Sequence, residues 1–293
     1  MLRYEGTLYR PPSEAESLIL QATIGCSYNE CTFCAMYRDK RFRVRKLEEL
    51  RAEIEWVASR AATEVRKVFL ADGDALVAKS SFLLELLGLL RAAFPNLQRV
   101  SCYASPQALE VRSVAEMSEL RRGGLTLYYL GIESGHDEVL GRLVKGVDSA
   151  RMVEVALKAH AADVKLSTMI LLGAGGRSLS LEHARESARV VNAIQPRYVS
   201  TLVMTPVEGT PLWEQAERGE VDELTPLELA AELREFIAGL ELRGSVFRSN
   251  HASNYLSVAG SLPKDKPALV AALDGVLASP ERARFRPRGL RGL

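Results

Sequence analysis

The stretch GCSYNECTFC, residues 25–34, places three of the chain's four cysteines within nine positions. Polar, turn-forming residues separate Cys26, Cys31 and Cys34, so a cluster of buried apolar side chains is not the expected structure. Three thiols leave one over after any pairing, which argues against local disulfides. Thiolates closely spaced on one irregular loop can instead converge on a single metal or iron–sulfur centre. The stretch therefore predicts a metal-binding loop.

The overall charge excludes a strong electrostatic attraction to nucleic acid or to a membrane. The 293 residues include 38 Lys and Arg against 37 Asp and Glu, a net charge of +1. A basic run, residues 37–46 (YRDKRFRVRK), follows the cysteines. It is predicted to be a solvated loop and helix start, with an anion-binding edge beside the cysteines as the alternative.

The N-terminus predicts a cytoplasmic protein. Residues 1–17 are polar and lack the apolar core of a signal peptide. No apolar run approaches the roughly 20 residues that span a bilayer. In the cytoplasm the thiols stay reduced and can act as ligands.

Apolar strand-like segments alternate with helical ones along most of the chain. Strands are expected at residues 18–26, 67–71, 99–106, 125–135, 164–176 and 197–206. Helices are expected at 45–62, 80–94, 113–124, 148–163 and 181–196. Six strand–helix units with nearly continuous apolar strands predict an α/β fold, a parallel sheet covered by helices.

The last part of the chain has a different pattern. It predicts a helix at 226–241, an irregular stretch at 245–260, a helix at 264–278 and a basic tail that frays. The predicted domains are therefore 1–212, a barrel with its N-terminal lead-in, and 213–293, a helical extension with a polar loop and a basic tail.

Polar and glycine residues follow the predicted strands one after another. The runs are DGD (72–74), ESG (133–135), GAGG (173–176) and PVEGTP (206–211). The carboxyl ends of parallel strands share one edge of the sheet, where ligands bind. Together with the cysteines, these runs predict one ligand site at that edge.

With these features, residues 18–212 resemble the radical S-adenosylmethionine (SAM) superfamily. The resemblance implies a partial (β/α)6, TIM-like barrel whose cysteines, here Cys26, Cys31 and Cys34, bind a [4Fe-4S] cluster. The fourth iron is left open to SAM, as catalysis requires of a metal. Cys31-x2-Cys34 has the family spacing, Cys26-x4-Cys31 is one residue longer than common, and Phe33 matches an aromatic residue near the adenine.

Further SAM contacts are implied position by position. Asp72 or Asp74 would accept hydrogen bonds from the SAM amino group. The GIESG stretch resembles oxygen-independent coproporphyrinogen oxidases and methylthiotransferases, which makes Glu133 the candidate for the ribose hydroxyls. Lys145 matches a basic residue that pairs with the SAM carboxylate. The remaining candidates for cofactor contact are Ser134, Ser167 and Gly173.

The implied activity is reductive cleavage of SAM, giving a 5′-deoxyadenosyl radical that abstracts hydrogen from a substrate. The electron would come from a reductant such as flavodoxin or ferredoxin. With no second cysteine triad and no RNA-binding barrel in sight, a small molecule, for instance a tetrapyrrole, is favoured over tRNA. The substrate and the oligomeric state stay open. A non-catalytic zinc or iron–sulfur scaffold is the alternative, and it would need a fourth ligand.

The remaining cysteine and histidines have simpler interpretations. Cys102 is predicted to be a buried structural thiol. His136, His160 and His183 are predicted to be solvated. The polar stretch FRSNHASNY after the barrel is interpreted either as a lid that contacts substrate or as a loop that satisfies its own backbone. Its candidate substrate contacts are Arg248, Asn250, His251 and Tyr255.

Overall fold

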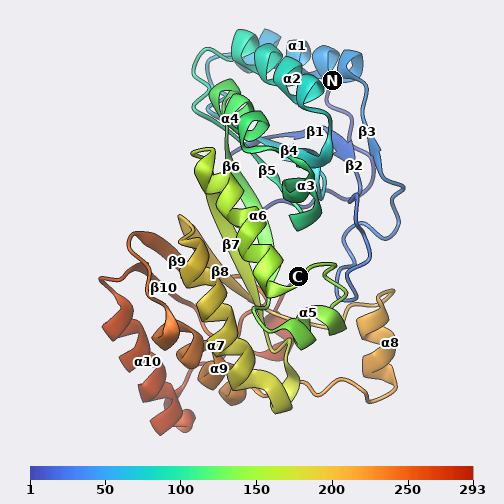
Figure 1. Cartoon of the computed structure of the whole chain (residues 1–293). Helices are drawn as coiled ribbons and strands as arrows, with labels where there is room; N and C mark the ends of the chain where they lie inside the picture. The colour runs from blue at the N-terminus through green and yellow to red at the C-terminus, as the bar shows by residue number, and fades with distance from the viewer. Residues whose placement is uncertain (293) are drawn as a thin grey trace. The chain divides into compact units, whose positions relative to one another are not determined.

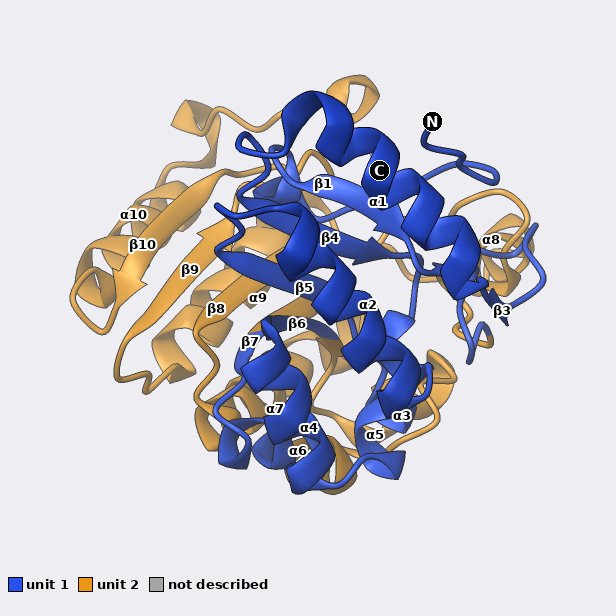
Figure 2. Ribbon diagram, turned by 90° about the horizontal axis from the view of Figure 1, so that it is seen from above, with its two compact units in different colours: residues 1–29, 36–130, 155–166 blue, residues 30–35, 131–154, 167–293 orange. Residues whose placement is uncertain are grey.

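The computed structural model describes residues 1–292, and the chain divides into two compact units (Figure 2). Unit 1 consists of residues 1–29, 36–130 and 155–166, and unit 2 of residues 30–35, 131–154 and the chain from Ser167 onward. Neither unit coincides with the predicted division at residue 212.

The strands form a mostly parallel sheet in the order β1-β4-β5-β6-β7-β8-β9-β10. This confirms the predicted α/β class. The elements within unit 1 are β1 (Leu18–Gln21), β2 (Thr23–Ile24), β3 (Arg43–Val44), α1 (Leu47–Ala61), β4 (Lys67–Ala71), α2 (Ser80–Ala93), β5 (Arg99–Tyr103), α3 (Pro106–Val111) and α4 (Val114–Gly123). Three elements have residues in both units: β6 (Leu125–Glu133), α6 (Ser149–Ala161) and β7 (Lys165–Leu172).

The helices of unit 1 pack through leucine-rich faces at helical spacing. In α1, Leu50, Ile54 and Val57 are buried, and α2 buries four leucines along one face. The two helices lie side by side (Figure 1). The apolar β4, KVFLA, is buried at four of its five positions, as expected of a parallel strand covered by helices.

A buried carboxylate fastens the N-terminal segment to unit 1. Glu14, in a 3-10 helix at Pro12–Glu14, is fully buried. It accepts hydrogen bonds from Arg99 Nη2 (2.7 Å), Ser101 Oγ (3.0 Å) and the Tyr129 hydroxyl (2.6 Å). Burial, together with this carboxylate, raises the pKa of Tyr129. The lead-in to the sheet is therefore an ordered part of the unit.

Unit 2 adds strands that the sequence did not predict. Its elements are α5 (Asp137–Arg142), α7 (Gly176–Ile194), β8 (Tyr198–Val203), α8 (Pro211–Glu217), α9 (Pro226–Gly239), β9 (Ser245–Ser249), β10 (Val258–Leu262) and α10 (Lys266–Ala278). The prediction of an irregular stretch at 245–260 is wrong, because β9 pairs parallel with β8 and β10 pairs antiparallel with β9. Ser245, Phe247 and Ser249 are buried on alternate positions, the period of a strand.

At β10, the last strand of the sheet, an aspartate binds one backbone N–H group. The N–H of Ser261 donates to Asp265 Oδ2 (2.7 Å), and a Cβ at Gly260 would lie 2.9 Å from the Asp265 Cβ. Helix α10 begins directly after this aspartate and packs on α9, which also packs on α7 (Figure 1).

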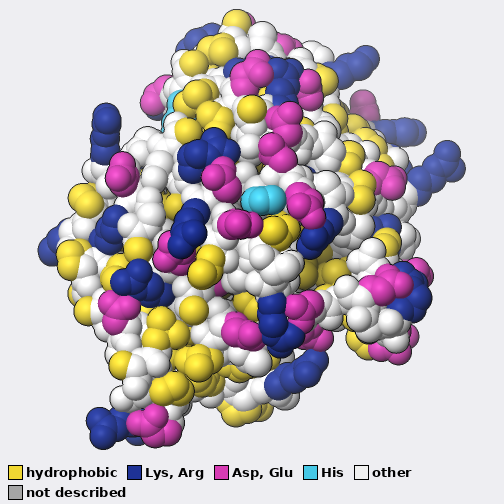
Figure 3. Space-filling model, turned by 60° about the horizontal axis from the view of Figure 1, so that its bottom comes forward, with side chains coloured by type: hydrophobic (Ala, Val, Ile, Leu, Met, Phe, Trp, Pro, Cys, Tyr) yellow, Lys and Arg dark blue, Asp and Glu magenta, His cyan; other side chains and the backbone are white. Residues whose placement is uncertain are grey.

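Charges of both signs are mixed on the surface. On the face shown in Figure 3, Lys and Arg side chains alternate with Asp and Glu rather than gathering in one basic patch. No helix in residues 1–292 combines the length and the apolar character that crossing a membrane takes.

Candidate functional site

In unit 1 the start of the cysteine loop is held by Asp72, directly after β4. Asp72 Oδ2 accepts hydrogen bonds from the N–H of Gly25 (2.9 Å), Gln21 Nε2 (2.9 Å) and Lys40 Nζ (3.1 Å). The side chains of Asp72 and Lys40 are 0% and 4% exposed. This carboxylate therefore ties β1, the residue before Cys26 and the basic run together.

Residue 73 fits against the first cysteine only because it is glycine. The N–H of Gly73 donates to the carbonyl of Gly25 (3.0 Å). A Cβ on Gly73 would lie 2.5 Å from the ring of Tyr37 and 2.9 Å from the Cβ of Cys26. The turn after β4 thus forms a close cradle for Cys26, as a loop that presents a metal ligand requires.

Asp74 holds the residue after Cys26. It is fully buried and accepts hydrogen bonds from Ser27 Oγ (2.5 Å), Ser105 Oγ (2.6 Å) and the N–H of Ser105 (3.1 Å). Burial raises the pKa of Asp74, although these hydrogen bonds act in the opposite direction. Asp72 and Asp74 are the candidates for the SAM amino group. Oδ2 of each already accepts a hydrogen bond from the cysteine loop, from Gly25 and Ser27 respectively. Asp72 Oδ1 is buried and has no hydrogen-bond partner within residues 1–292.

The basic run is only partly the solvated loop that was predicted, since Arg41, Arg43 and Lys46 are exposed. Tyr37 is 2% exposed and packs edge-on against Tyr9, and Arg45 is 7% exposed and pairs with Glu53 (2.8 Å). Lys40 pairs with Asp72, as described above. The prediction is wrong for Lys40 and Arg45 because carboxylates compensate the charges that they bring into the interior.

In unit 2 the rest of the cysteine loop is fixed by its backbone. The N–H of Thr32 donates to the carbonyl of Leu143 (3.0 Å), and the carbonyl of Thr32 accepts from the N–H of Leu212 (3.0 Å). Cys31 and Cys34, on either side, are partly exposed, as is Cys26 in unit 1. The loop therefore presents its thiols from an anchored backbone.

Phe33 packs into an apolar cluster at the ends of β7 and β8, here called the Phe33 cluster. Its other members are Val139, Leu143, Leu171, Leu179, Leu202, Met204 and Ala174. The cluster brings the cysteine loop against the residues that precede Gly173. An adenine ring stacked beside Phe33 would find an apolar, water-poor surface there.

Glu133 and Lys145 form a buried pair. Lys145 Nζ donates to Glu133 Oε1 at 2.9 Å, and the side chains are 10% and 6% exposed, respectively. Glu133 Oε2 is buried without a hydrogen-bond partner in the described chain. Glu133 has φ +66°, and a Cβ on Gly131 would lie 1.9 Å from Glu133 Oε1. A strained residue with an unused buried oxygen is typical of a ligand site.

Behind this pair, Ser134 belongs to a buried polar network centred on His183. His183 Nε2 donates to the carbonyl of Leu171 (3.0 Å), so Nδ1 accepts from the Ser134 hydroxyl (2.8 Å). Burial lowers the pKa of His183 to about 4, which keeps the ring neutral at pH 7. The prediction of a solvated His183 is wrong, because the residue lies on the buried face of α7.

Glu232 of α9 supports the glycine turn after β7. Its Oε1 accepts from the N–H of Gly173 (2.7 Å) and its Oε2 from Ser180 Oγ (2.5 Å). Burial raises the pKa of Glu232 to about 7. The turn that contains Gly173 is thus fixed by a residue from the C-terminal part of the chain.

Ser167, another predicted cofactor contact, lies near the beginning of β7. Ser167 is the third residue of this strand, five positions before Leu172, or roughly 16 Å along it. It is half-buried and lies well away from Gly173. The strand position therefore separates these two candidates.

The polar stretch after the barrel, residues 247–255, contains the end of β9 with Arg248 and most of the connection to β10. Arg248 and Asn250 are exposed, and His251 Nδ1 binds Ser253 of the same loop (2.9 Å). Burial, together with nearby Arg286, lowers the pKa of His251. Tyr255 lines a pocket at the ends of β7 and β8. Of the four candidate substrate contacts, Tyr255 is the one that lines this pocket.

Several residues of these networks carried no functional prediction. They are Gln21, Lys40, His183 and Glu232. For His183 a signal exists: it lies one helical turn before Ser187 on the stripe that Ala184, Ala188 and Val191 continue. Lys40 and Glu232 gave no such signal, since their partners Asp72 and Gly173 are 32 and 59 positions away.

Cys102 is buried, as predicted, in the middle of β5. Its burial raises its thiol pKa, which disfavours the thiolate form that binds metals. Within residues 1–292 no group of three or more His, Cys, Asp or Glu is assembled as a metal site. Cys26 belongs to unit 1, whereas Cys31 and Cys34 belong to unit 2. The donor set, three partly exposed thiols, fits an iron–sulfur cluster.

Comparison with known proteins identifies the family. The family model of the radical SAM superfamily matches residues 20–189, more than half of the chain. None of the curated proteins matches.

Solved structures with a similar fold include methylornithine synthase (PylB), at 17% identity and a TM-score of 0.55, covering 92% of this chain and 74% of that one. Coproporphyrinogen III oxidase (HemN) from Escherichia coli has 16% identity and a TM-score of 0.57, covering 76% and 51%. The methyltransferase TsrM from Kitasatospora setae has 18% identity and a TM-score of 0.56, covering 69% and 39%. This chain thus spans about half of HemN and less of TsrM. The family match and the shared fold lead to one conclusion: the chain belongs to the radical SAM superfamily.

Proposed function

We propose that this chain is a radical SAM enzyme in which Cys26, Cys31 and Cys34 bind a [4Fe-4S] cluster and whose substrate is a small molecule. The observation that carries the proposal is the family match over residues 20–189, which contains all three cysteines. The cradle that Gly73 forms for Cys26 and the anchored backbone of Thr32 support it.

When bound, the cluster that Cys26, Cys31 and Cys34 would hold would supply the electron for reductive cleavage of SAM, chemistry that would serve to abstract a hydrogen atom from the substrate. A flavodoxin or ferredoxin is the proposed source of that electron.

The residues of this chain bind and orient the cofactor. Glu133 accepts hydrogen bonds from the ribose hydroxyls through Oε2, the buried oxygen that has no other partner in the described chain. Lys145 pairs with the SAM carboxylate and is already held in place by Glu133. Phe33 lies against the adenine.

Apolar residues exclude water from the reaction. The Phe33 cluster covers the segment that presents Cys31 and Cys34 with side chains of β7 and β8. A radical intermediate needs such protection, because exposure to solvent or stray partners would quench it.

Replacing Cys31 with Ala tests the proposal. We expect the variant to lose the iron of the cluster, the broad absorption near ~400 nm and the release of 5′-deoxyadenosine, because two thiolates are left to bind the cluster. Cys102→Ala is the matched control, since it removes a buried thiol outside the loop, and it should keep all three signals.

Two outcomes would contradict the proposal. A Cys31→Ala protein that assembles a full cluster and cleaves SAM would exclude the assigned ligands. A wild-type protein that binds zinc, stays colourless and cleaves no SAM under reducing, anaerobic conditions would instead support the non-catalytic scaffold.

A further inference from the structure

A pocket at the carboxyl ends of β7 and β8 has charged groups of both signs in its wall. An inner cavity of about 20 Å³ lies among Gly173, Met204, Leu229 and Tyr255. An outer cavity of about 520 Å³ shares Glu223, Leu224 and Tyr255 with it. The outer cavity has the volume of a small-molecule site, and the inner cavity beside it has room for about one water-sized group.

The positive group of the inner cavity is Arg291, which has unused hydrogen-bonding capacity. Arg286 and Arg288 line the outer cavity. Its guanidinium lies over the ring of Tyr255, 4.3 Å from the ring centre. Arg291 Nη2 donates to Thr205 Oγ1 (3.1 Å), while Nε is buried with no hydrogen-bond partner in residues 1–292. A buried N–H without a partner is costly, and a carboxylate is the acceptor that a guanidinium binds best.

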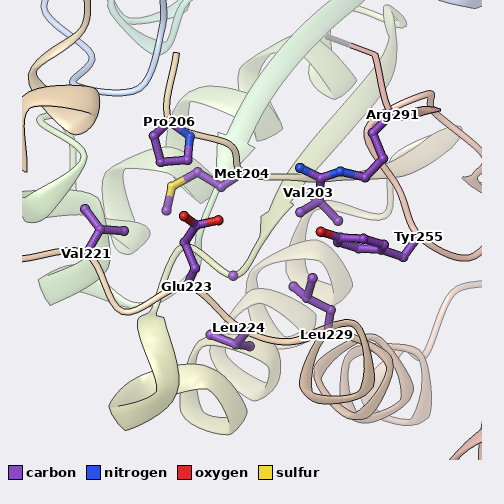
Figure 4. Close-up of a pocket in the computed structure, with 10 residues that line it drawn as sticks. Val203, Met204, Pro206, Val221, Glu223, Leu224, Leu229, Tyr255 and Arg291 are labelled. Atoms are coloured by element: carbon purple, nitrogen blue, oxygen red, sulfur yellow. The ribbon is translucent and has the colours of Figure 1, made fainter. Parts of the chain in front are cut away.

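The negative group is Glu223, on the opposite wall. Figure 4 shows the carboxylate of Glu223, the guanidinium of Arg291 and the hydroxyl of Tyr255 turned toward the middle of the pocket. Arg288 Nη2 lies 3.6 Å from Glu223, but both side chains are largely exposed, so this pair is weak. Glu223 can therefore accept a cationic group from a ligand.

The chain end that carries Arg291 is held firmly in place. Arg286 Nη1 donates to the carbonyls of His251 (3.0 Å), Ala252 (2.5 Å) and Asn254 (3.2 Å). The N–H of Arg286 donates to the carbonyl of Tyr255 (2.8 Å). The predicted fraying of the basic tail is thus wrong for this segment, because its arginine satisfies carbonyls of the polar loop.

That loop is itself attached to the sheet. Asn254 Oδ1 accepts from the N–H of Val203 (2.9 Å), and its Nδ2 donates to the carbonyl of Thr201 (2.8 Å). The support of Tyr255 and Arg291 therefore runs back to β8, as a preorganised site requires.

The pocket shares a residue with the Phe33 cluster. Met204 lines the pocket and belongs to this cluster, which also contains the residue proposed to lie against adenine. The pocket is therefore next to the surface proposed for the cofactor.

We propose that this pocket binds the substrate and that the substrate is an α-amino acid or a similar zwitterion. Its carboxylate binds Arg291 and the Tyr255 hydroxyl at the inner cavity, its ammonium group binds Glu223, and the rest of the molecule lies in the outer cavity. The substrate assignment rests on the proposed function, whereas the ligand class rests on the pocket alone.

Binding to the purified full-length protein tests the ligand class. The probes are the twenty L-amino acids, with acetate and methylamine as half-ligands, measured by thermal shift and calorimetry in excess SAM so that the SAM site is not the one measured. At least one amino acid should bind, and both half-ligands should bind far more weakly. Arg291→Gln and Glu223→Gln should each weaken binding by about tenfold or more, since each removes one charge-assisted contact.

Matched controls are the exposed residues Arg284 and Glu217. Arg284→Gln and Glu217→Gln should leave binding unchanged, because neither lines the pocket. Binding of none of the amino acids, or equal binding of acetate with no loss in Glu223→Gln, would overturn the zwitterion assignment. Amino-acid binding that survives Arg291→Gln and Glu223→Gln would overturn the pocket.

The substrate role has its own test. The amino acid that binds should increase 5′-deoxyadenosine release from protein with a full cluster, and less so in Arg291→Gln. Binding without this increase, in a protein that cleaves SAM, would overturn the substrate role. If the protein lacks a cluster and cleaves no SAM, the proposed function fails, and the binding data still decide the ligand class.

Discussion

Asp72 and Glu133 are two buried carboxylates that differ in how many hydrogen bonds they accept from the chain. Asp72 directly follows β4 and Glu133 ends β6, and each pairs with a lysine, at 3.1 and 2.9 Å. Each also has one oxygen without a partner in the described chain. Asp72 Oδ2, however, accepts three hydrogen bonds, whereas the contact described for Glu133 Oε1 is Lys145 alone.

This difference separates a structural anchor from a ligand contact. Gln21, Gly25 and Lys40 converge on Asp72, so its removal would break three hydrogen bonds at once. Glu133 has a strained backbone conformation beside Gly131. Its carboxylate accepts a hydrogen bond from Lys145, and its Oε2 has no partner in the described chain. Residue type and position after a strand do not distinguish the two roles, but the number of internal partners does.

The largest effect is expected for Asp72→Ala. It should lower the free energy of unfolding by about 3–5 kcal/mol, because Lys40 remains as a buried charge with the carbonyl of Thr7 but no carboxylate beside it. Urea unfolding of the wild type and the variant measures this loss. Lys40→Met in the same chain should recover part of it. If Asp72→Ala is as stable as the wild type and only SAM binding falls, Asp72 is a ligand contact like Glu133.

A smaller effect, on ligand affinity, is expected for the second pair. Glu133→Gln and Lys145→Ala should each weaken SAM binding by about 1–3 kcal/mol, since each removes a charged partner from a polar contact. Titration calorimetry on protein with a full cluster gives the affinity, and iron content serves as the control. Unchanged affinity in both variants would remove this pair from the site.

The smallest effect concerns Glu232, a buried carboxylate that faces His183 (3.7 Å) instead of a lysine. Burial raises its pKa from 4.5 to about 7, so the folded state holds a proton that the unfolded state has lost. Its contribution to stability is complete below pH 4.5 and is lost as the pH rises toward 7. Glu232→Gln should remove this loss.

The stability of Glu232→Gln relative to the wild type should therefore rise by about 1.4 kcal/mol between pH 5.5 and 6.5. Urea unfolding at the two pH values measures the difference. His183, whose pKa burial lowers to about 4, contributes in the opposite direction in both proteins, so its effect cancels in the comparison. A difference that is independent of pH would show that Glu232 is ionised in the folded protein.

The sequence predicted the parallel strands and the cysteine loop because both depend on local patterns. Apolar β4 and the spacing of Cys31 and Cys34 can be read within a few residues. The strands β9 and β10 were not predicted, because they are short and carry Ser, Arg and Gly among few apolar residues. The pairing of β9 with β8 and of β10 with β9 stabilises them, and that pairing is a tertiary effect.

The supporting residues of the site could not be predicted for a similar reason. Lys40 stands in a basic run that has the composition of a solvated surface, and its carboxylate lies 32 positions away. Arg286 stands in a tail rich in Arg, Pro and Gly, yet it binds carbonyls more than 30 positions earlier. Charged side chains are placed inside by partners that the fold brings to them, and local sequence contains no record of those partners.

The hydrogen bond between Asp265 and β10 has a consequence for the behaviour of the protein in concentrated solution. A sheet edge with unpaired N–H groups is a template on which a second chain can add a strand, the first step of many aggregates. Here the N–H of Ser261 is already occupied by Asp265, and the carboxylate places a negative charge in the path of an approaching strand. Asp265 thus removes one N–H group to which an added strand could bind, and we expect it to oppose edge-to-edge association of two chains.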